Sequence, residues 1–295
     1  MVVVITGPTC VGKTKLSVLL AKYFNGEIIN CDSTQVYKYL NIATAKATIE
    51  EQSNIKHHLM DFLELEQDYT IFDYQKDARE VIKKIENENK LPIMVGGTGL
   101  YIKSCLYDYS FLEEEKHDLS NLKTDELYEI LKNINSDLTI DKNNRQRLER
   151  AYNYYLNHGK LNEEKNSSLL YDTLFIGLTT NRENLYNKIN KRVDTMINNG
   201  LLEEAKMIYD LNIKSKAVMT PIGYKELFLY FEKIESLDVC LEKIKQRSRK
   251  YAKRQYTFFN HQLPINWLEV DYDNFDNTVN AAIKLIEQYK KDTKN

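Results

Sequence analysis

The sequence predicts an α/β protein in which helices flank a parallel sheet and a helical subdomain is inserted into the chain. Over the first hundred residues, short β-rich runs alternate with helical patterns, as in consecutive βαβ units. From about 104 to 170 the composition becomes charged, asparagine-rich and helical. The 295 residues, 42% of them hydrophobic, can bury one large core or two modest ones. We therefore expect a core formed by residues 1–103 and 171–295, with residues 104–170 as the insertion.

Short apolar runs are the candidate strands, and longer periodic patterns are the candidate helices. The strand candidates are residues 2–6, 27–31, 93–95 and 173–178, with a further short one around 265–270. The helix candidates are residues 14–24, a crossover helix within 72–85, and a long amphipathic helix from about 185 that Gly200 interrupts. The remainder of the chain is expected to be mostly helical.

The composition predicts a soluble, cytoplasmic protein. No stretch approaches the roughly 20 apolar residues of a membrane helix, and the apolar run at 2–5 is too short for a signal peptide. The four cysteines, Cys10, Cys31, Cys105 and Cys240, are scattered and contain no CxxC pair. This spacing argues against a zinc site and against a disulfide framework.

Charge is nearly balanced, at −2, so binding of nucleic acid would require a local excess of positive charge. Residues 243–254 provide such an excess, with no acidic residue among them. Their basic residues are Lys243, Lys245, Arg247, Arg249, Lys250, Lys253 and Arg254. Two interpretations stay open at this point: a surface that binds phosphates, or an ordinary solvated helix face.

The strongest motif is a phosphate-binding loop of the form GxxxxGK[ST]. It consists of Gly7, Pro8, Thr9, Cys10, Val11, Gly12, Lys13 and Thr14, between a candidate strand and a candidate helix. Its glycines let backbone N–H groups face an anion, and the helix N-terminus adds its positive end. We expect Lys13 to reach a terminal phosphate and the Thr14 hydroxyl to ligate Mg²⁺. The motif predicts a P-loop NTPase-like core.

A second glycine-rich loop, Gly96-Gly97-Thr98-Gly99, follows the candidate strand 93–95, at the edge where a parallel sheet binds ligands. It is either a ligand loop or a tight strand-to-helix turn with Thr98 as a helix cap. The strand before it ends in glycine and not in the acid that holds Mg²⁺ in P-loop hydrolases.

The candidate strand that does end in an acid is 27–31, which Asp32 follows. We expect the Asp32 carboxylate at the ligand edge of the sheet, close to the P-loop. Three roles fit this residue on the sequence alone: a metal ligand, a helix N-cap or a general base.

Further motifs resemble the tRNA dimethylallyltransferase family. Residues 32–37 (DSTQVY) with 42–46 (IATAK) look like the second signature of that family, the P-loop being the first. Similar blocks follow in order: 57–61 (HHLMD), 95–101 (VGGTGLY), 144–148 (NRQRL), Arg182 before Leu185-Tyr186, 223–226 (GYKE) and 252–255 (AKRQ). The ordered set covers nearly the whole chain.

The resemblance implies a prenyl transfer. Members of the family move a dimethylallyl group from dimethylallyl diphosphate to the N6 amine of the adenosine 3′ of the anticodon in tRNA, and release diphosphate. The P-loop would then hold a diphosphate leaving group, neutralised by Lys13, Mg²⁺ on Thr14, and Arg182. Asp32 is implied as the base for the amine proton, and Thr98 as a partner of the amine or the bridging oxygen. His57 also matches a family position, yet fits a structural histidine as well.

The resemblance also implies how a monomer would bind tRNA. Ser33, Thr34 and Gln35, next to Asp32, are candidates for reading a flipped adenine. Gln146, Arg147 and Arg150 are candidates for holding the anticodon loop, with the insertion and the basic run gripping phosphates. Two departures from the family pattern concern this side: Phe258 stands where tryptophan is common, and the insertion between Tyr101 and Arg145 is shorter than usual.

Three other functions stay open on the sequence. An isopentenyltransferase acting on free adenine nucleotide would share the P-loop and Asp32, although the insertion and the basic run disfavour it. A P-loop small-molecule kinase would consume ATP. A non-catalytic nucleotide-binding or RNA-binding module would bind its ligand without turnover.

Overall fold

The computed structural model describes residues 1–109, 115, 117–161 and 168–293. The chain forms two compact units: Met1–Tyr107 with Leu169–Asn295, which we call the core, and Asp108–Ser168, which we call the insertion. The insertion begins at Asp108 and not at 104, because helix α4 (Gly99–Leu106) continues to Leu106 and buries its apolar residues in the core.

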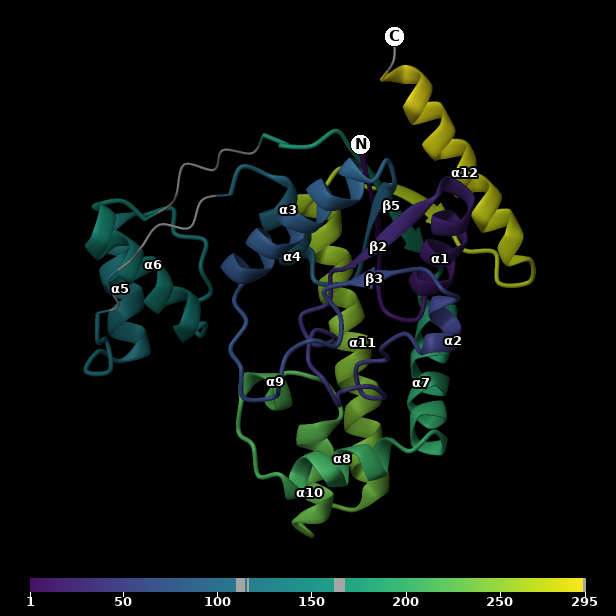
Figure 1. Ribbon diagram of the computed structural model, residues 1–295. Coiled ribbons are helices and arrows are strands. Elements are labelled where there is room, and N and C mark those ends of the chain that lie inside the picture. Colours follow the sequence, from purple (N-terminus) through teal and green to yellow (C-terminus); the bar gives the residue numbers. More distant parts are fainter. Residues whose placement is uncertain (110–114, 116, 162–167, 294–295) are drawn as a thin grey trace. The chain divides into compact units, whose positions relative to one another are not determined.

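A six-stranded parallel sheet forms the centre of the core (Figure 1). The strand order is β3-β2-β4-β1-β5-β6. The strands are β1 (Val2–Thr6), β2 (Gly26–Asn30), β3 (His57–His58), β4 (Leu91–Val95), β5 (Thr173–Thr179) and β6 (Asn266–Glu269). The α/β prediction is confirmed, and each predicted strand is found within two residues of its expected bounds. Strand β3 was not predicted, because two residues are too short to show a period.

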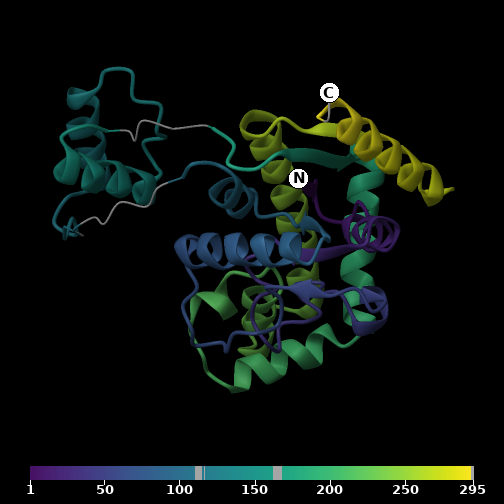
Figure 2. The same ribbon diagram turned by 45° about the horizontal axis from the view of Figure 1, so that its top comes forward.

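Helices cover both faces of this sheet, which is why its central strands are apolar along their whole length. Val3 and Ile5 of β1 pack on one face with α1 (Lys13–Phe24) and α12 (Phe275–Asp292). Val2 and Val4 pack on the other face with α3 (Ile71–Asn87), α4 and the end of α11 (Leu237–Gln262). Figure 2 shows α3, in blue, and α12, in yellow, on these different sides.

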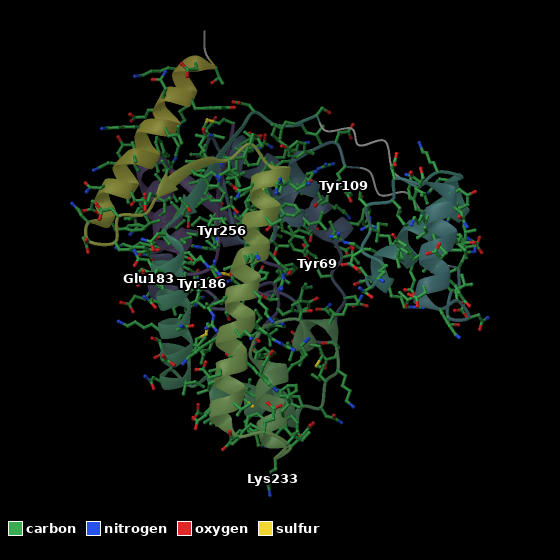
Figure 3. All side chains as sticks on the ribbon, turned by 180° about the vertical axis from the view of Figure 1, so that it is seen from behind. Tyr69, Tyr109, Glu183, Tyr186, Lys233 and Tyr256 are labelled. Carbon is green, nitrogen blue, oxygen red and sulfur yellow. The ribbon has the colours of Figure 1, made fainter. Side chains whose placement is uncertain are left out.

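A second group of helices extends the core beyond the sheet. It comprises α7 (Arg182–Asn198), α8 (Leu201–Asp210), α9 (Lys216–Met219), α10 (Tyr224–Phe231) and the first half of α11. The short α2 (Ile49–Gln52) lies outside this group and contacts α1. Gly200, at φ 96°, separates α7 from α8, as predicted. Helices α7 and α11 pack together, and Figure 3 labels Tyr186 on the first and Tyr256 on the second. No helix in the described part of the chain is long and apolar enough to cross a membrane.

The insertion contains α5 (Thr124–Ile134) and α6 (Arg145–His158), which pack through a small apolar cluster. Arg145 supports this unit by donating to the carbonyl oxygens of Leu119 (3.0 Å) and Leu122 (2.7 Å). The chain leaves and re-enters the core at one place, because Tyr107 pairs with Leu169 and the Leu170 amide donates to the Leu106 carbonyl at 2.8 Å.

Candidate functional site

The P-loop joins β1 to α1 at the carboxyl edge of the sheet. Gly7 has a φ of 132°, and a side chain there would lie 2.4 Å from the Leu178 carbonyl oxygen, so only glycine fits. Gly12, at φ 88°, is the N-cap of α1, and the first turn of that helix carries no acidic residue. The free N–H groups of this turn and its helix dipole therefore favour an anion.

Lys13 lies half-buried inside the loop. Its Nζ donates to the carbonyl oxygens of Gly7 (3.1 Å) and Pro8 (2.6 Å). Burial and, to a smaller extent, the positive charge of Arg192 lower the pKa of Lys13 to about 8, although Cys10 and Asp32 act in the opposite direction. A bound anion would reverse this balance, because it favours the charged ammonium.

Arg192 of α7 is a candidate site residue that the motifs did not indicate. Its Nη1 donates to the Thr9 hydroxyl at 3.0 Å and lies 3.6 Å from the Cys10 sulfur. The available signal was its position three residues after buried Ile189, which places a cation beside the apolar face of the helix.

Arg182, the arginine predicted for the diphosphate, lies elsewhere on the same helix. It is the first residue of α7, about 15 Å along the axis from Arg192, since each residue adds about 1.5 Å. Its exposed guanidinium lies over the Tyr186 ring at 5.1 Å, and no contact with the P-loop is found among the described residues. Among the described residues, the arginine that contacts the P-loop is therefore Arg192 and not Arg182.

The affinity for inorganic diphosphate is expected to fall as the pH rises above about 8. Below this pH Lys13 is charged, and above it the free protein must take up a proton to bind the anion. Calorimetry in two buffers of different ionisation enthalpy should show proton uptake at pH 8, and Lys13→Met should abolish the uptake and weaken binding. Lys22→Met, at an exposed site on α1, is the control. Affinity that stays constant from pH 7 to 9 would contradict this assignment.

Asp32 follows β2 and is half-buried. Its Oδ1 accepts hydrogen bonds from the Thr34 amide (2.9 Å) and the Thr34 hydroxyl (2.6 Å), and its own amide donates to Asn30 Oδ1 (3.1 Å). Within the described part of the chain, Oδ2 accepts no hydrogen bond. The helix N-cap interpretation is excluded, because the next helix, α2, begins only at Ile49.

The surroundings of Asp32 place it on the P-loop side of the sheet. Its negative charge opposes the lowering of the Lys13 pKa. The same charge also raises the pKa of the Tyr251 phenol, although burial is the larger cause of that increase. The Thr98 hydroxyl accepts from the Ser33 amide at 3.2 Å, and the Thr98 amide donates to the Cys31 carbonyl at 3.0 Å. Asp32 and Thr98 therefore occupy one site with Lys13, as predicted. Thr98 occupies the N-cap position of α4 without a side-chain cap bond.

The second glycine loop is packed closely against α11. A side chain on Gly97 would lie 2.1 Å from Gln255 Nε2, and one on Gly99 would lie 2.2 Å from the Phe258 ring. Buried Gln255 bridges the two loops, because its Oε1 accepts from the Thr9 amide (3.0 Å) while its Nε2 donates to the Gly97 carbonyl (3.2 Å). These glycines thus serve close packing, and Gln255 fixes both sides of the site.

Two of the three candidates for reading adenine have their donor groups engaged inside the chain. The Thr34 hydroxyl donates to Asp32, and Gln35 Nε2 donates to the carbonyl oxygens of Thr44 (3.0 Å) and Ala45 (3.3 Å). In this structure these two side chains shape the loop after Asp32. The Ser33 hydroxyl makes no hydrogen bond with any described residue.

His57 lies on β3, where one ring nitrogen, Nδ1, is 2.8 Å from the Ile55 carbonyl oxygen. Burial lowers its pKa below the usual value. The contact fits a neutral ring that fixes the path of the chain. The structural interpretation of His57 is therefore the better one.

The basic run on α11 is divided between structural and exposed cations. Ion pairs or hydrogen bonds engage Lys243 with Glu235, Lys245 with Asp194, Arg247 with Glu226, and Arg249 with Asn190. Lys250, Lys253 and Arg254 are exposed and make no ion pair in the described ranges, and their spacing puts them on one helix face. In the insertion, Gln146, Arg147 and Arg150 are exposed on α6.

Known proteins resemble this chain over nearly its whole length. A family model described as IPP transferase matches residues 35–262. The chain is 46% identical over 299 residues to a tRNA dimethylallyltransferase of Anoxybacillus flavithermus, covering 97% of this chain and 96% of the relative. It is 42% identical over 285 residues to that of Bacillus subtilis, covering 91% and 90%. The chain belongs to the tRNA dimethylallyltransferase family.

Solved structures of related transferases have the same fold as this chain. The tRNA delta(2)-isopentenylpyrophosphate transferase of Staphylococcus epidermidis is 38% identical, with a TM-score of 0.75 and coverage of 97% of this chain and 98% of that one. A eukaryotic dimethylallyltransferase acting on tRNA is 30% identical, with a TM-score of 0.85 and coverage of 99% and 79%. The predicted fold class and enzyme class are confirmed, and the kinase and the non-catalytic module are set aside.

Proposed function

We propose that this enzyme transfers a dimethylallyl group from dimethylallyl diphosphate to the N6 amine of the adenosine 3′ of the anticodon in tRNA, releasing diphosphate. The observation that carries the proposal is the arrangement at one sheet edge. Two cations, Lys13 and Arg192, meet at the P-loop. A carboxylate with one unengaged oxygen, that of Asp32, lies beside them. The cations suit a departing anion and the carboxylate suits an incoming amine.

Lys13 and Arg192 would stabilise the leaving group. As the allylic C–O bond breaks, the electron pair stays on the diphosphate oxygen, and the allylic carbon carries partial positive charge. The P-loop amides and both cations stand in place before the reaction, so they stabilise the developing charge without reorganising. The amine nitrogen attacks this carbon directly, so no covalent enzyme intermediate is required.

Asp32 would accept the amine proton. The N6 lone pair of adenine is delocalised into the ring, so a positioned base contributes on the order of 10²–10⁴-fold. Thr34 fixes Oδ1 and leaves Oδ2 to face the substrate. Thr98, held between Ser33 and Cys31, lies next to the same point and can hydrogen-bond the amine or the bridging oxygen.

Mg²⁺ fits the donor set at the P-loop. The Thr14 hydroxyl makes no hydrogen bond with the rest of the described chain, so it can act as a ligand. No group of three or more His, Cys, Asp or Glu side chains suited to a metal ion is found in the described ranges. Mg²⁺ held by Thr14 would therefore take most of its oxygen ligands from diphosphate and water, and would supply further positive charge at the leaving group.

The tRNA would bind through phosphate contacts and a flipped base. A stacked adenine has to leave its stack to reach a site at the sheet edge. Lys250, Lys253 and Arg254 on α11, and Gln146, Arg147 and Arg150 on α6, are the exposed groups that we assign to the RNA backbone. Ser33 is the remaining free hydroxyl for the adenine edge.

Incubation of the enzyme with dimethylallyl diphosphate and either unmodified tRNA or AMP tests the proposal. We expect transfer to tRNA, seen as a mass gain on one adenosine, with equimolar diphosphate release and no need for ATP. A tRNA with guanosine at the acceptor position is the matched control and should remain unmodified. Transfer to AMP alone would refute the tRNA substrate and favour the free-nucleotide isopentenyltransferase.

A further inference from the structure

One buried carboxylate accepts hydrogen bonds from several backbone amides of the loop that follows Asp32. Glu204 of α8 is 9% exposed. It accepts hydrogen bonds from the consecutive amides of Asn41 (3.0 Å), Ile42 (2.8 Å) and Ala43 (3.0 Å). The buried Tyr224 hydroxyl donates to it as well, at 2.7 Å.

This arrangement requires a carboxylate. A buried charge is tolerated only where it is well hydrogen-bonded, and bonds to a charged acceptor are the stronger ones. Both oxygens of Glu204 accept from the loop, since Ile42 donates to each of them and Asn41 and Ala43 to one apiece. A glutamine would turn an NH₂ group toward N–H donors and leave buried donors unpaired.

The loop held in this way is residues 35–46, which we call the anchored segment. Gln35 Nε2 closes it by donating to the carbonyl oxygens of Thr44 and Ala45. Lys46 Nζ donates to the Tyr37 carbonyl (2.7 Å), and the Lys46 amide to the Asn41 carbonyl (2.9 Å). Glu204 therefore supports from outside a segment that also makes several hydrogen bonds within itself.

The anchored segment is also bonded to the loop that follows β3. The amides of Asp61 (3.0 Å) and Phe62 (2.9 Å) donate to the carbonyl oxygens of Gln35 and Val36, and Lys46 Nζ pairs with the Asp61 carboxylate at 2.5 Å. The blocks at 32–37, 42–46, 57–61 and 223–226 are thus parts of one hydrogen-bonded structure at the carboxyl edge of the sheet.

We propose that Glu204 is a positioning residue for the RNA substrate: by fixing the amides of residues 41–43, it holds the anchored segment in the shape that receives the target nucleotide and its neighbours. The inference rests on the proposed function. It points to RNA and not to the diphosphate, because the P-loop is tied to Gln255 and Arg192, and no hydrogen bond joins it to the anchored segment in the described ranges.

Glu204→Gln should therefore separate the two substrates. We expect the KM for tRNA and the Kd for tRNA to rise about tenfold or more, the KM for dimethylallyl diphosphate to stay unchanged, and kcat to fall by less than about threefold. The turnover is expected to survive because Asn30, on β2, holds the Asp32 amide independently. Tyr224→Phe removes one donor and should raise the KM for tRNA by a smaller factor. Glu203→Gln, at the exposed neighbouring position, is the matched control and should match the wild type.

Three outcomes would overturn the inference. If Glu204→Gln has the wild-type KM for tRNA but a lower melting temperature, Glu204 contributes only to stability. A fall in kcat with native tRNA affinity would show that it acts through Asp32. If Glu204→Gln does not fold, Tyr224→Phe decides, and native tRNA affinity in that variant refutes the proposal. Should the wild type and Glu203→Gln fail to prenylate tRNA, the proposed function fails instead, and tRNA binding by fluorescence anisotropy still tests the role of Glu204.

Discussion

Replacing Asp32 with asparagine is expected to lower kcat by at least about 100-fold while the affinity for tRNA is retained. The amide keeps an oxygen for the two bonds from Thr34 but cannot accept a proton from the adenine amine. Single-turnover prenyl transfer measures the chemical step, and fluorescence anisotropy measures tRNA binding on the same preparation.

A matched change of charge at an exposed acid controls for this loss. Asp68 is exposed and makes no hydrogen bond or ion pair with other described residues, so Asp68→Asn should leave the single-turnover rate at the wild-type value. Diphosphate affinity should also persist in Asp32→Asn, because Lys13 and Arg192 remain. A wild-type rate in Asp32→Asn would remove the general-base role of this residue.

Replacing Arg192 with glutamine is expected to lower kcat/KM for dimethylallyl diphosphate by about 10²–10³-fold, the range typical for one lost transition-state donor. The guanidinium donates to Thr9 and lies within Coulomb range of Lys13, where negative charge would build on the leaving diphosphate. Part of the loss should fall on kcat, because the interaction strengthens as the C–O bond breaks. Steady-state kinetics at saturating tRNA measures both parameters.

Arg182→Gln is the paired control on the same helix. Its guanidinium rests on the Tyr186 ring, so this variant should retain nearly full activity. A second readout is the pH dependence of diphosphate binding. Arg192 lowers the pKa of Lys13, so in Arg192→Gln the loss of affinity should begin at a higher pH than in the wild type. If Arg182→Gln proved the more damaging change, the diphosphate would have to lie at the start of α7.

Local patterns predicted the parts of the site that are built from consecutive residues. The P-loop and Asp32 each follow a strand directly, so the order strand, loop and ligand group is written in one short stretch of chain. The edges of β2 and β4 bring Asp32 and Thr98 to the same place, because parallel strands end at one edge.

Local patterns could not predict contacts between segments that are far apart in the sequence. Gln255 and Arg192 reach Thr9 across 246 and 183 residues, and their neighbours in the sequence give no sign of this target. The basic run shows the complementary difficulty. The sequence displays the cations of α11, but the acids that pair with several of them lie on or beside other helices, as Asp194 and Glu226 do. Hence only the packing reveals which charges remain exposed.

The short bridge between Tyr107 and Leu169 bears on how freely the insertion can change in length. Tyr107 and Leu169, at the two ends of the insertion, both belong to the core and pair with each other. The insertion is therefore a loop whose two ends are already held together. Doubling such a loop costs only about 0.6 kcal/mol in closure entropy. The core can therefore carry a shorter insertion than is usual in the family at little thermodynamic penalty, and the length of the insertion can change while the residues of the core stay the same.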